Sequence, residues 1–325
     1  MAIGMYLDFE KPVIELEKRI DQMREFATDE NVELTREIRL LELKLEKLRR
    51  ETFSSLTRWQ RVQLARHPLR PTAAEYFELM TENYVALHGD RTFSDDRALI
   101  GGFAKIDGLH VLMLGQQKGR TTKQKLHHNF GMCHPDGYRK ALRLMELAAR
   151  YGRPIVILID TPGAFPGIGA EERGQAEAIA HNIRDMAALE VPIIVMIIGE
   201  GASGGALGIG IGDRVLMLEN SWYSVISPEG CAAILWKDHP NPLQMAPEAA
   251  EALQPTAQDL KEFGIADVVL PEPLGGAHRD PEEQARIVKG AVVAHLRELL
   301  GWPTSELIRR RHEKYRRIGP YAELT

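Results

Sequence analysis

The chain has 325 residues, of which 44% are hydrophobic and 27% are charged, and this composition is typical of a globular protein with a sizeable core. The formal net charge of -5 argues against a generally basic nucleic-acid-binding protein. With only two cysteines, Cys133 and Cys231, we expect no disulfide framework and a cytoplasmic location. The first residues do not resemble a signal peptide. The longest apolar run, residues 191–198, is shorter than the ~20 residues of a membrane helix, so no membrane span is expected.

Residues 1–70 have the pattern of a helical hairpin. Apolar residues recur at spacings of three and four in two stretches, 13–23 and 34–48, and a polar break separates them. Asp29, in that break, is a candidate N-cap for the second helix. The apolar stripe could bind a partner as a coiled coil, but we favour packing on its own domain. We therefore predict a helical extension, followed by a main domain at residues 71–325.

From about residue 98 the pattern changes to strands that alternate with helices. The dipeptide Asp107-Gly108 predicts a hairpin turn, and the long apolar runs further on are typical of buried parallel strands. The alternation indicates a layered α/β domain. The predicted segments are strands within 98–115, 153–160 and 191–198, and helices at 138–150 and 170–189.

The most informative segment is the glycine-rich turn that follows the strand at 191–198. The sequence G-E-G-A-S-G-G-A starts at residue 199, and its glycines allow backbone N–H groups to approach a ligand without obstruction. If Ser203 to Ala206 open a helix, their N–H groups lack intrahelical acceptors and lie at the positive end of the helix dipole. Such a turn can hold an oxyanion.

Three interpretations of this turn compete. Gly201-Ala202-Ser203-Gly204-Gly205 satisfies G-x-S-x-G, so Ser203 could be the nucleophile of a serine hydrolase. That chemistry needs a base and an acid, and none of the eleven histidines lies in a recognisable partner motif. The second interpretation, a dinucleotide or phosphate loop, fails because neither fingerprint is complete. The third uses only backbone donors, which would stabilise an enolate or amide-like oxyanion.

Further motifs are similar to those of one family. Together with L-D-F-E near the start and W-x-R-V-Q-L-A-R-H-P at 59–68, they resemble the alpha subunit of the carboxyltransferase component of bacterial acetyl-coenzyme A carboxylase. The resemblance covers nearly the whole chain, to about residue 280. The motifs are K-G-R-T-T-K at 118–123, N-F-G-M at 129–132, D-G-Y-R-K-A-L-R-L-M at 136–145, D-T-P-G-A-F-P-G-I-G-A-E-E-R-G-Q at 160–175, S-V-I-S-P-E-G-C-A-A-I-L-W-K at 224–237 and E-P-L-G-G-A-H-R-D at 272–280.

The resemblance implies a fold, a reaction and partners. The fold would be a crotonase-like (ClpP/crotonase) spiral of ββα units after the N-terminal helical hairpin. The reaction would transfer carboxylate from carboxybiotin, on a biotin carboxyl carrier protein, to acetyl-CoA. The product, malonyl-CoA, is formed in the first committed step of fatty acid biosynthesis. The expected partners are a zinc-ribbon-bearing beta subunit in an α2β2 assembly, the carrier protein and biotin carboxylase, with the active site shared between alpha and beta.

The resemblance also implies site residues. Gly204 and Gly205 match the glycines whose N–H groups bind the ureido oxygen of biotin. The loop T-P-G-A-F-P-G at 161–167 follows the neighbouring strand, and we expect it to form an apolar wall of the carboxybiotin pocket. The expected pocket residues are Gly163, Ala164, Phe165, Gly167, Gly201 and Ser203.

A metal site is not expected in this chain. His127, His128, Cys133 and His134 lie close together in the sequence, but their spacings lack the paired ligands that structural zinc prefers. The zinc ribbon of the resembled family belongs to the beta partner.

Two basic segments allow more than one interpretation. Residues 118–125 could contact a phosphate of CoA or a carrier protein, or could be solvated loop charge. Residues 309–317 could bind an acidic partner or nucleic acid, although charge at a helix end is the simpler explanation.

Overall fold

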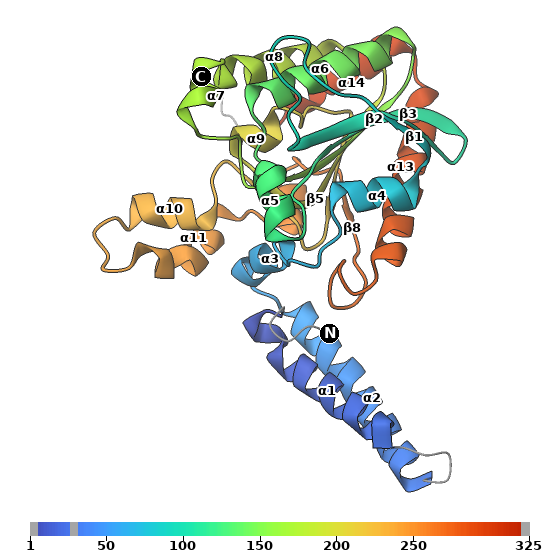
Figure 1. Cartoon of the computed structure of the whole chain (residues 1–325), viewed down its shortest axis with the longest axis vertical. Coiled ribbons are helices and arrows are strands. Elements are labelled where there is room, and N and C mark those ends of the chain that lie inside the picture. The colour runs from blue at the N-terminus through green and yellow to red at the C-terminus, as the bar shows by residue number, and fades with distance from the viewer. Residues whose placement is uncertain (1–5, 27–31, 320–325) are drawn as a thin grey trace, which may run out of the picture.

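An eight-stranded sheet lies at the centre of the main body, in a computed structural model that describes residues 6–26 and 32–319 (Figure 1). The strand order is β1-β2-β3-β4-β5-β6-β8, and β7 pairs with the last residues of β5. Strands β1 to β3 are antiparallel to one another, whereas β3, β4, β5, β6 and β8 run parallel. The strands are β1 (Glu82–Ala86), β2 (Leu99–Ile106), β3 (Leu109–Gln116), β4 (Ile155–Thr161), β5 (Ile193–Ala202), β6 (Arg214–Leu218), β7 (Trp222–Ser224) and β8 (Val268–Leu270).

The predicted strands are present because their apolar runs fill both faces of the sheet. In β4, Ile155, Ile157 and Ile159 belong to one buried cluster, and Val156 and Leu158 belong to another. Alternate residues of a strand point to opposite faces, so a continuous apolar run suits a strand with helices on both sides. Asp107 and Gly108, with φ of 47° and 84°, form the predicted hairpin turn between β2 and β3.

Helices cover both faces of this sheet. Residues of α6 and α8 pack in the first cluster, and those of α4 and α13 pack in the second (Figure 1). Within the described residues, no helix is both long and apolar enough to cross a membrane. The helices of the main body are α4 (Ala73–Met80), α5 (Thr122–His127), α6 (Pro135–Arg150), α7 (Ile168–Glu172), α8 (Gln175–Ala188), α9 (Ser203–Leu207), α10 (Pro228–Leu235), α11 (Ala246–Leu253), α12 (Ala257–Glu262), α13 (Pro281–Leu300) and α14 (Thr304–Arg316), with the 3-10 turns η2 (Asn129–Gly131) and η3 (Pro242–Met245).

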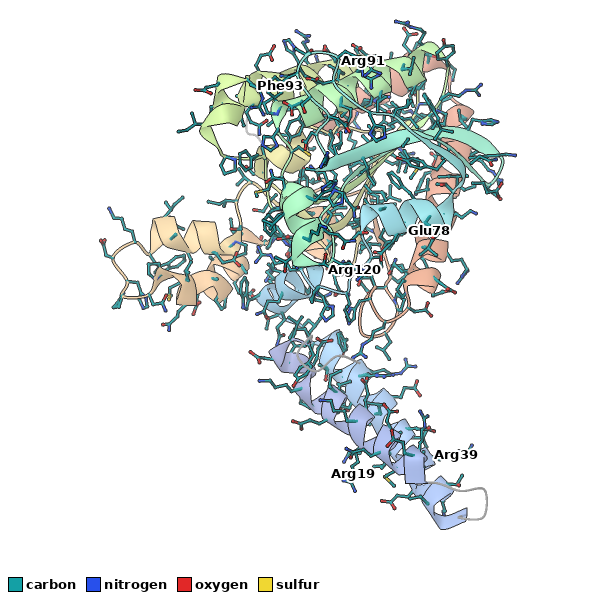
Figure 2. The ribbon with its side chains drawn as sticks, in the orientation of Figure 1. Arg19, Arg39, Glu78, Arg91, Phe93 and Arg120 are labelled. Atoms are coloured by element: carbon teal, nitrogen blue, oxygen red, sulfur yellow. The ribbon has the colours of Figure 1, made fainter. Side chains whose placement is uncertain are left out.

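The N-terminal helices pack against each other and project from the body (Figure 1). After the 3-10 turn η1 (Asp8–Glu10), α1 (Lys11–Phe26) and α2 (Val32–Ser54) bury a shared stripe of apolar residues between them. Figure 2 shows Arg19 and Arg39 on outer faces of this hairpin. The candidate N-cap Asp29 lies outside the described residues. A short helix, α3 (Arg58–Ala65), then leads into the body.

One predicted helix is wrong in its continuity. Residues 170–189 do not form a single helix, because the chain breaks between α7 and α8 at Gly174, whose φ is 80°. A glycine adopts this left-handed conformation without steric cost, so it ends one helix and redirects the chain into the next.

Candidate active site

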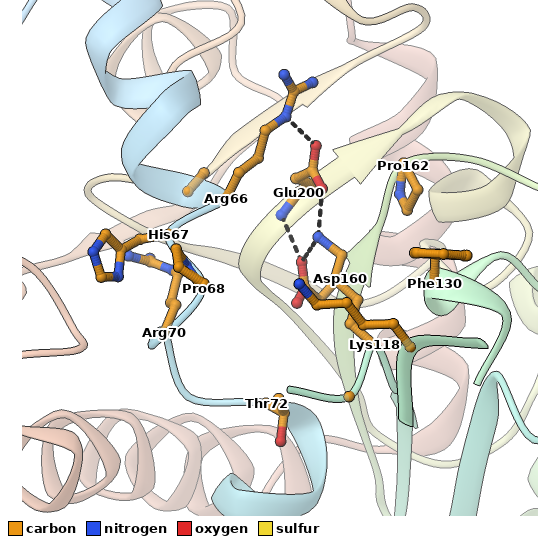
Figure 3. A pocket seen from close by; sticks show the side chains of 13 residues that line it. Arg66, His67, Pro68, Arg70, Thr72, Lys118, Phe130, Asp160, Pro162 and Glu200 are labelled. Atoms are coloured by element: carbon orange, nitrogen blue, oxygen red, sulfur yellow. Dashed lines mark hydrogen bonds and ion pairs between the residues drawn. The ribbon is translucent and has the colours of Figure 1, made fainter. Parts of the chain in front are cut away.

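A cavity of about 280 Å³ opens at the carboxyl ends of β3, β4 and β5. These parallel strands end at the same edge of the sheet, which is where α/β proteins commonly bind ligands. The remaining wall comes from the segment after α3 and from the segment around α5 and η2. The lining residues are Ala65, Arg66, His67, Pro68, Arg70, Thr72, Lys118, Gly119, Lys125, Phe130, Asp160, Pro162 and Glu200 (Figure 3).

A network of four charged side chains forms the polar side of this cavity (Figure 3). The Lys118 ammonium lies 2.7 Å from a carboxylate oxygen of Asp160 and also contacts Glu200. Arg66 donates from Nε to the other oxygen of Glu200 at 2.5 Å. The backbone N–H of Glu200 donates to Asp160 at 2.9 Å, so β4 and β5 are joined through side chain and backbone.

Burial and pairing oppose each other in this network. Burial alone would raise the pKa of Glu200, but Lys118 and Arg66 outweigh it and hold that pKa below its usual range. Burial would lower the pKa of Lys118, but Asp160 and Glu200 raise it. The pKa of Asp160 is raised, because its burial and the nearby Glu200 charge outweigh Lys118. The network therefore presents ionised Lys118 and Glu200 to the cavity at neutral pH.

The two loops predicted to form the site contact each other. The turn at residues 201–206, which we call the glycine turn, enters the five-residue helix α9. A Cβ placed on Gly205 would lie 2.2 Å from the carbonyl carbon of Gly163 and 2.4 Å from the nitrogen of Ala164. Only glycine fits there, because no real Cβ approaches backbone atoms so closely. Gly204 is more open, since a Cβ there would lie 3.5 Å from the nearest atom, in Ile179.

The other predicted pocket residues have distinct surroundings. Phe165 stacks on His134 with ring centroids 4.3 Å apart, and Gly167 leaves room for the Phe165 ring. Gly201 lies in β5, where a Cβ would come within 2.8 Å of the Tyr223 ring. The cavity lining includes Pro162 from the predicted loop, whereas none of the predicted glycines lies on it.

Ser203 stands at the start of α9 with a φ of +56°, and its side chain is exposed. A serine nucleophile needs a base within hydrogen-bond reach. Among residues 6–26 and 32–319, none makes a hydrogen bond to the Ser203 hydroxyl, so the serine hydrolase alternative gains no support. Within the same ranges no side chain caps α9 either, so its first-turn N–H groups have no side-chain acceptor there.

One group of side chains has the composition of a metal site. Ligand atoms of Glu10, His67 and His278 lie within 4.8 Å of one another. The two imidazole rings are stacked at 3.8 Å with an angle of 20°, so their in-plane lone pairs do not converge on one point. Nδ1 of His67 accepts from the N–H of Leu69 at 3.2 Å, which places the proton of a neutral ring on Nε2. This geometry favours a link between chain segments over metal coordination.

The basic segments are largely paired. Lys118 belongs to the buried network, and Arg120 pairs with Glu75 at 2.7 Å. In the C-terminal basic segment, Arg309 pairs with Glu306 of its own helix at 2.7 Å. Arg311 is fully buried, where it binds Asp213 and backbone carbonyls. At least these two arginines of the segment therefore make ion pairs within the chain.

Sequence reasoning missed the charged network. Asp160 and Glu200 are carboxylates near the ends of otherwise apolar strands, and this contrast is a signal that could have identified them. Their partners could not be predicted in the same way, because Arg66 lies 134 residues from Glu200 and Lys118 lies 82 residues from it.

Comparison with known proteins gives a family for nearly the whole chain. Residues 6–319 match the family described as acetyl co-enzyme A carboxylase carboxyltransferase-like. The chain is 56% identical to the acetyl-coenzyme A carboxylase carboxyl transferase subunit alpha of Geobacter metallireducens, over 99% of this chain and 100% of that protein. The subunits of the same name from Chlorobium luteolum and Thermus thermophilus are 54% and 52% identical, over 98% of this chain and at least 98% of each relative.

Solved structures share the fold at lower identity. The transcarboxylase 12S crystal structure aligns with a TM-score of 0.56 at 19% identity, over 69% of this chain and 41% of that one. A Pseudomonas malonate decarboxylase hetero-tetramer in complex with coenzyme A gives 0.56 at 18% identity, over 76% and 97%. The crotonase-like α/β fold predicted from the sequence is confirmed. From the full-length match and these identities, the chain belongs to the acetyl co-enzyme A carboxylase carboxyltransferase-like family.

Proposed function

We propose that this chain is the alpha half of a carboxyltransferase that moves carboxylate from carboxybiotin to acetyl-CoA and so forms malonyl-CoA. The family supports the reaction class, since the relatives are alpha subunits of acetyl-coenzyme A carboxylase carboxyl transferase. The observation that carries the chemistry is the glycine turn, where Gly205 packs on the backbone of Gly163 and Ala164.

In this proposal the N–H groups of Gly204 and Gly205 are the catalytic donors. Negative charge develops on the ureido oxygen of biotin as its carboxyl group leaves. N–H groups already aimed at that oxygen stabilise the charge without reorganising, and one such donor is typically worth about 3 kcal/mol in the transition state. The start of α9 also places the positive end of a helix dipole there.

The remaining pocket residues would shape the site around these donors. Gly163 and Ala164 hold the turn from the neighbouring loop, and Phe165 supplies an apolar surface beside His134. Gly167, Gly201 and Ser203 are the other residues that we propose for the carboxybiotin pocket. We propose no metal for this chain, because the reaction needs none here and the Glu10 group has an unsuitable geometry.

The proposal includes partners and organisation. A zinc-ribbon-bearing beta subunit in an α2β2 assembly would supply donors for the thioester enolate, and a biotin carboxyl carrier protein would deliver carboxybiotin formed by biotin carboxylase. We place the protein in the cytoplasm, which suits its two free, buried cysteines. The division into a helical extension at residues 1–70 and a transferase domain at 71–325 also belongs to the proposal.

Reconstitution tests the shared site. The purified chain should transfer little carboxylate alone, and activity should appear when a beta subunit is added, measured as malonyl-CoA formed from acetyl-CoA and a carboxybiotin donor. Full activity of the isolated chain would contradict the shared site.

A Ser203→Ala variant serves as the matched control for the hydrolase alternative. In the reconstituted complex it should still transfer carboxylate, because the backbone donors are unchanged. Loss of transfer together with labelling of wild-type Ser203 by a serine-reactive probe would favour the hydrolase instead.

A further inference from the structure

Two buried side chains hold the carbonyl group of Gly205 from outside the predicted loops. Gln116, at the end of β3, donates from Nε2 to this oxygen at 2.8 Å, and the Tyr138 hydroxyl of α6 donates to it at 3.2 Å. Both side chains are fully buried. They lie beneath the turn and have no exposed surface with which to touch a ligand.

The glycine turn needs such support. Helix α9 has only five residues, and a helix of this length has almost no stability of its own. The adjacent glycines Gly204 and Gly205 add conformational freedom that must be lost on folding. Oxyanion donors are most effective when their direction is fixed before the reaction. Contacts from neighbouring elements must therefore fix the turn.

The bonds around Gly205 define its two peptide planes. The N–H of Gly208 donates to the carbonyl of Gly204 at 2.9 Å, which turns the N–H of Gly205 toward the opposite side, at the start of the helix. The bonds from Gln116 and Tyr138 fix the next peptide plane through the Gly205 carbonyl. Together they leave the backbone of Gly205 little freedom to rotate.

Gln116 also connects the turn to the charged network. Its Oε1 accepts the backbone N–H of Asp160 at 3.3 Å, and this bond sets the amide so that Nε2 faces Gly205. Asp160 in turn binds Lys118 at 2.7 Å. One buried side-chain amide therefore links the end of β4 to the glycine turn.

We propose that Gln116 and Tyr138 are positioning residues that aim the N–H groups of the glycine turn at the oxyanion. This inference rests on the proposed function, because it assigns the turn its catalytic role. The two side chains act through Gly205 and do not touch substrate. Their removal should lower the rate of the chemical step more than it weakens substrate binding.

The test compares Tyr138→Phe with Tyr76→Phe in the reconstituted complex. Tyr138→Phe removes one hydroxyl and keeps the ring, which packs against Gly208. Tyr76 is equally buried, but its hydroxyl has no hydrogen-bond partner among the described residues, so Tyr76→Phe controls for the loss of a buried hydroxyl. We expect kcat to fall about ten-fold in Tyr138→Phe, with KM for acetyl-CoA within two-fold. In Tyr76→Phe, kcat should stay within two-fold of wild type.

A second variant, Gln116→Met, removes the other donor, and kcat is normalised to the folded fraction measured by urea unfolding. Gln116→Met should lower kcat at least as far as Tyr138→Phe; if it does not fold, Tyr138→Phe decides alone. A kcat in Tyr138→Phe equal to that of Tyr76→Phe overturns the positioning role. The Gly205→Ala variant distinguishes failure of the positioning role from failure of the proposed function. If Gly205→Ala has wild-type activity, the catalytic role of the glycine turn is overturned. If Gly205→Ala is inactive while Tyr138→Phe is as active as Tyr76→Phe, only the positioning role is overturned.

Discussion

Neighbouring glycines in the glycine turn face different surroundings. Gly205 is buried against the backbone of the adjacent loop, and its carbonyl is bound from two sides. Gly204 is partly exposed and has room for a methyl group. Gly204 can therefore accept a small side chain, whereas the packing at Gly205 requires glycine.

This difference predicts unequal effects of one substitution. Gly205→Ala should lower kcat at least 100-fold, because the methyl group displaces the Gly163–Ala164 backbone, and overpacking of this kind typically costs about 1–3 kcal/mol of stability. Gly204→Ala should keep kcat within about three-fold, since alanine is a better helix former than glycine and meets no clash. Steady-state kinetics and urea unfolding of both variants check this, and equal losses would contradict the steric argument.

At the scale of elements, the segment between α3 and α4 joins the extension to the sheet. The Arg70 guanidinium binds Glu272 through both nitrogens of its fork and donates from Nε to the carbonyl of Ile198 at 2.7 Å. Burial would raise the pKa of Glu272, but Arg70 outweighs it and holds that pKa below its usual range. Arg66 and His67 of the same segment line the cavity. The predicted domain division at residue 70 thus falls within a segment that packs on the body.

Removal of Arg70 should destabilise the protein strongly. Arg70→Met leaves the fully buried Glu272 carboxylate without its cation, and breaking a buried pair in this way typically costs about 3–5 kcal/mol. The matched control is Arg50→Met, which breaks an exposed pair with Glu46 and should cost less than about 1 kcal/mol. Free energies of unfolding in urea measure both, and similar values for the two variants would show that the buried pair contributes little.

The elements that the sequence predicts well are those with a local pattern. Apolar runs predict β4 and β5, and the loops that follow these two strands contact each other in the structure. The break at Gly174 was missed, because a single glycine within a helical pattern does not reveal a left-handed backbone. Gln116 and Tyr138 were missed for another reason: their bonds to Gly205 span 89 and 67 residues, and such pairs depend on the topology of the sheet.

At the scale of the whole molecule, one buried cluster joins distant segments. Glu10 comes from η1 before the helical hairpin, His67 follows α3, and His278 lies between β8 and α13. The rings of His67 and His278 stack on each other, and Oε1 of Glu10 lies 3.7 Å from Nε2 of His278. The hairpin is thereby attached to the body through groups whose charge depends on pH.

This cluster predicts a loss of stability in mild acid. Burial, His67 and nearby arginines lower the pKa of His278 to about 2, whereas the unfolded chain has the ordinary value of 6.5. As the pH falls through 6.5, the unfolded state binds a proton that the folded state does not, so the free energy of unfolding decreases. One group of this kind should lower the free energy of unfolding by about 1 kcal/mol between pH 7 and pH 5.5.

The measurement is best confined to this pH range. Burial raises the pKa of Glu10, and protonation of Glu10 changes the free energy of unfolding in the opposite direction near that pKa. In His278→Asn the change of unfolding free energy with pH should be smaller by that amount. His181→Asn, at an exposed position that pairs with Glu177 of its own helix, should keep the wild-type slope. Urea unfolding at several pH values measures this, and identical slopes for wild type and His278→Asn would show that His278 does not control the acid sensitivity.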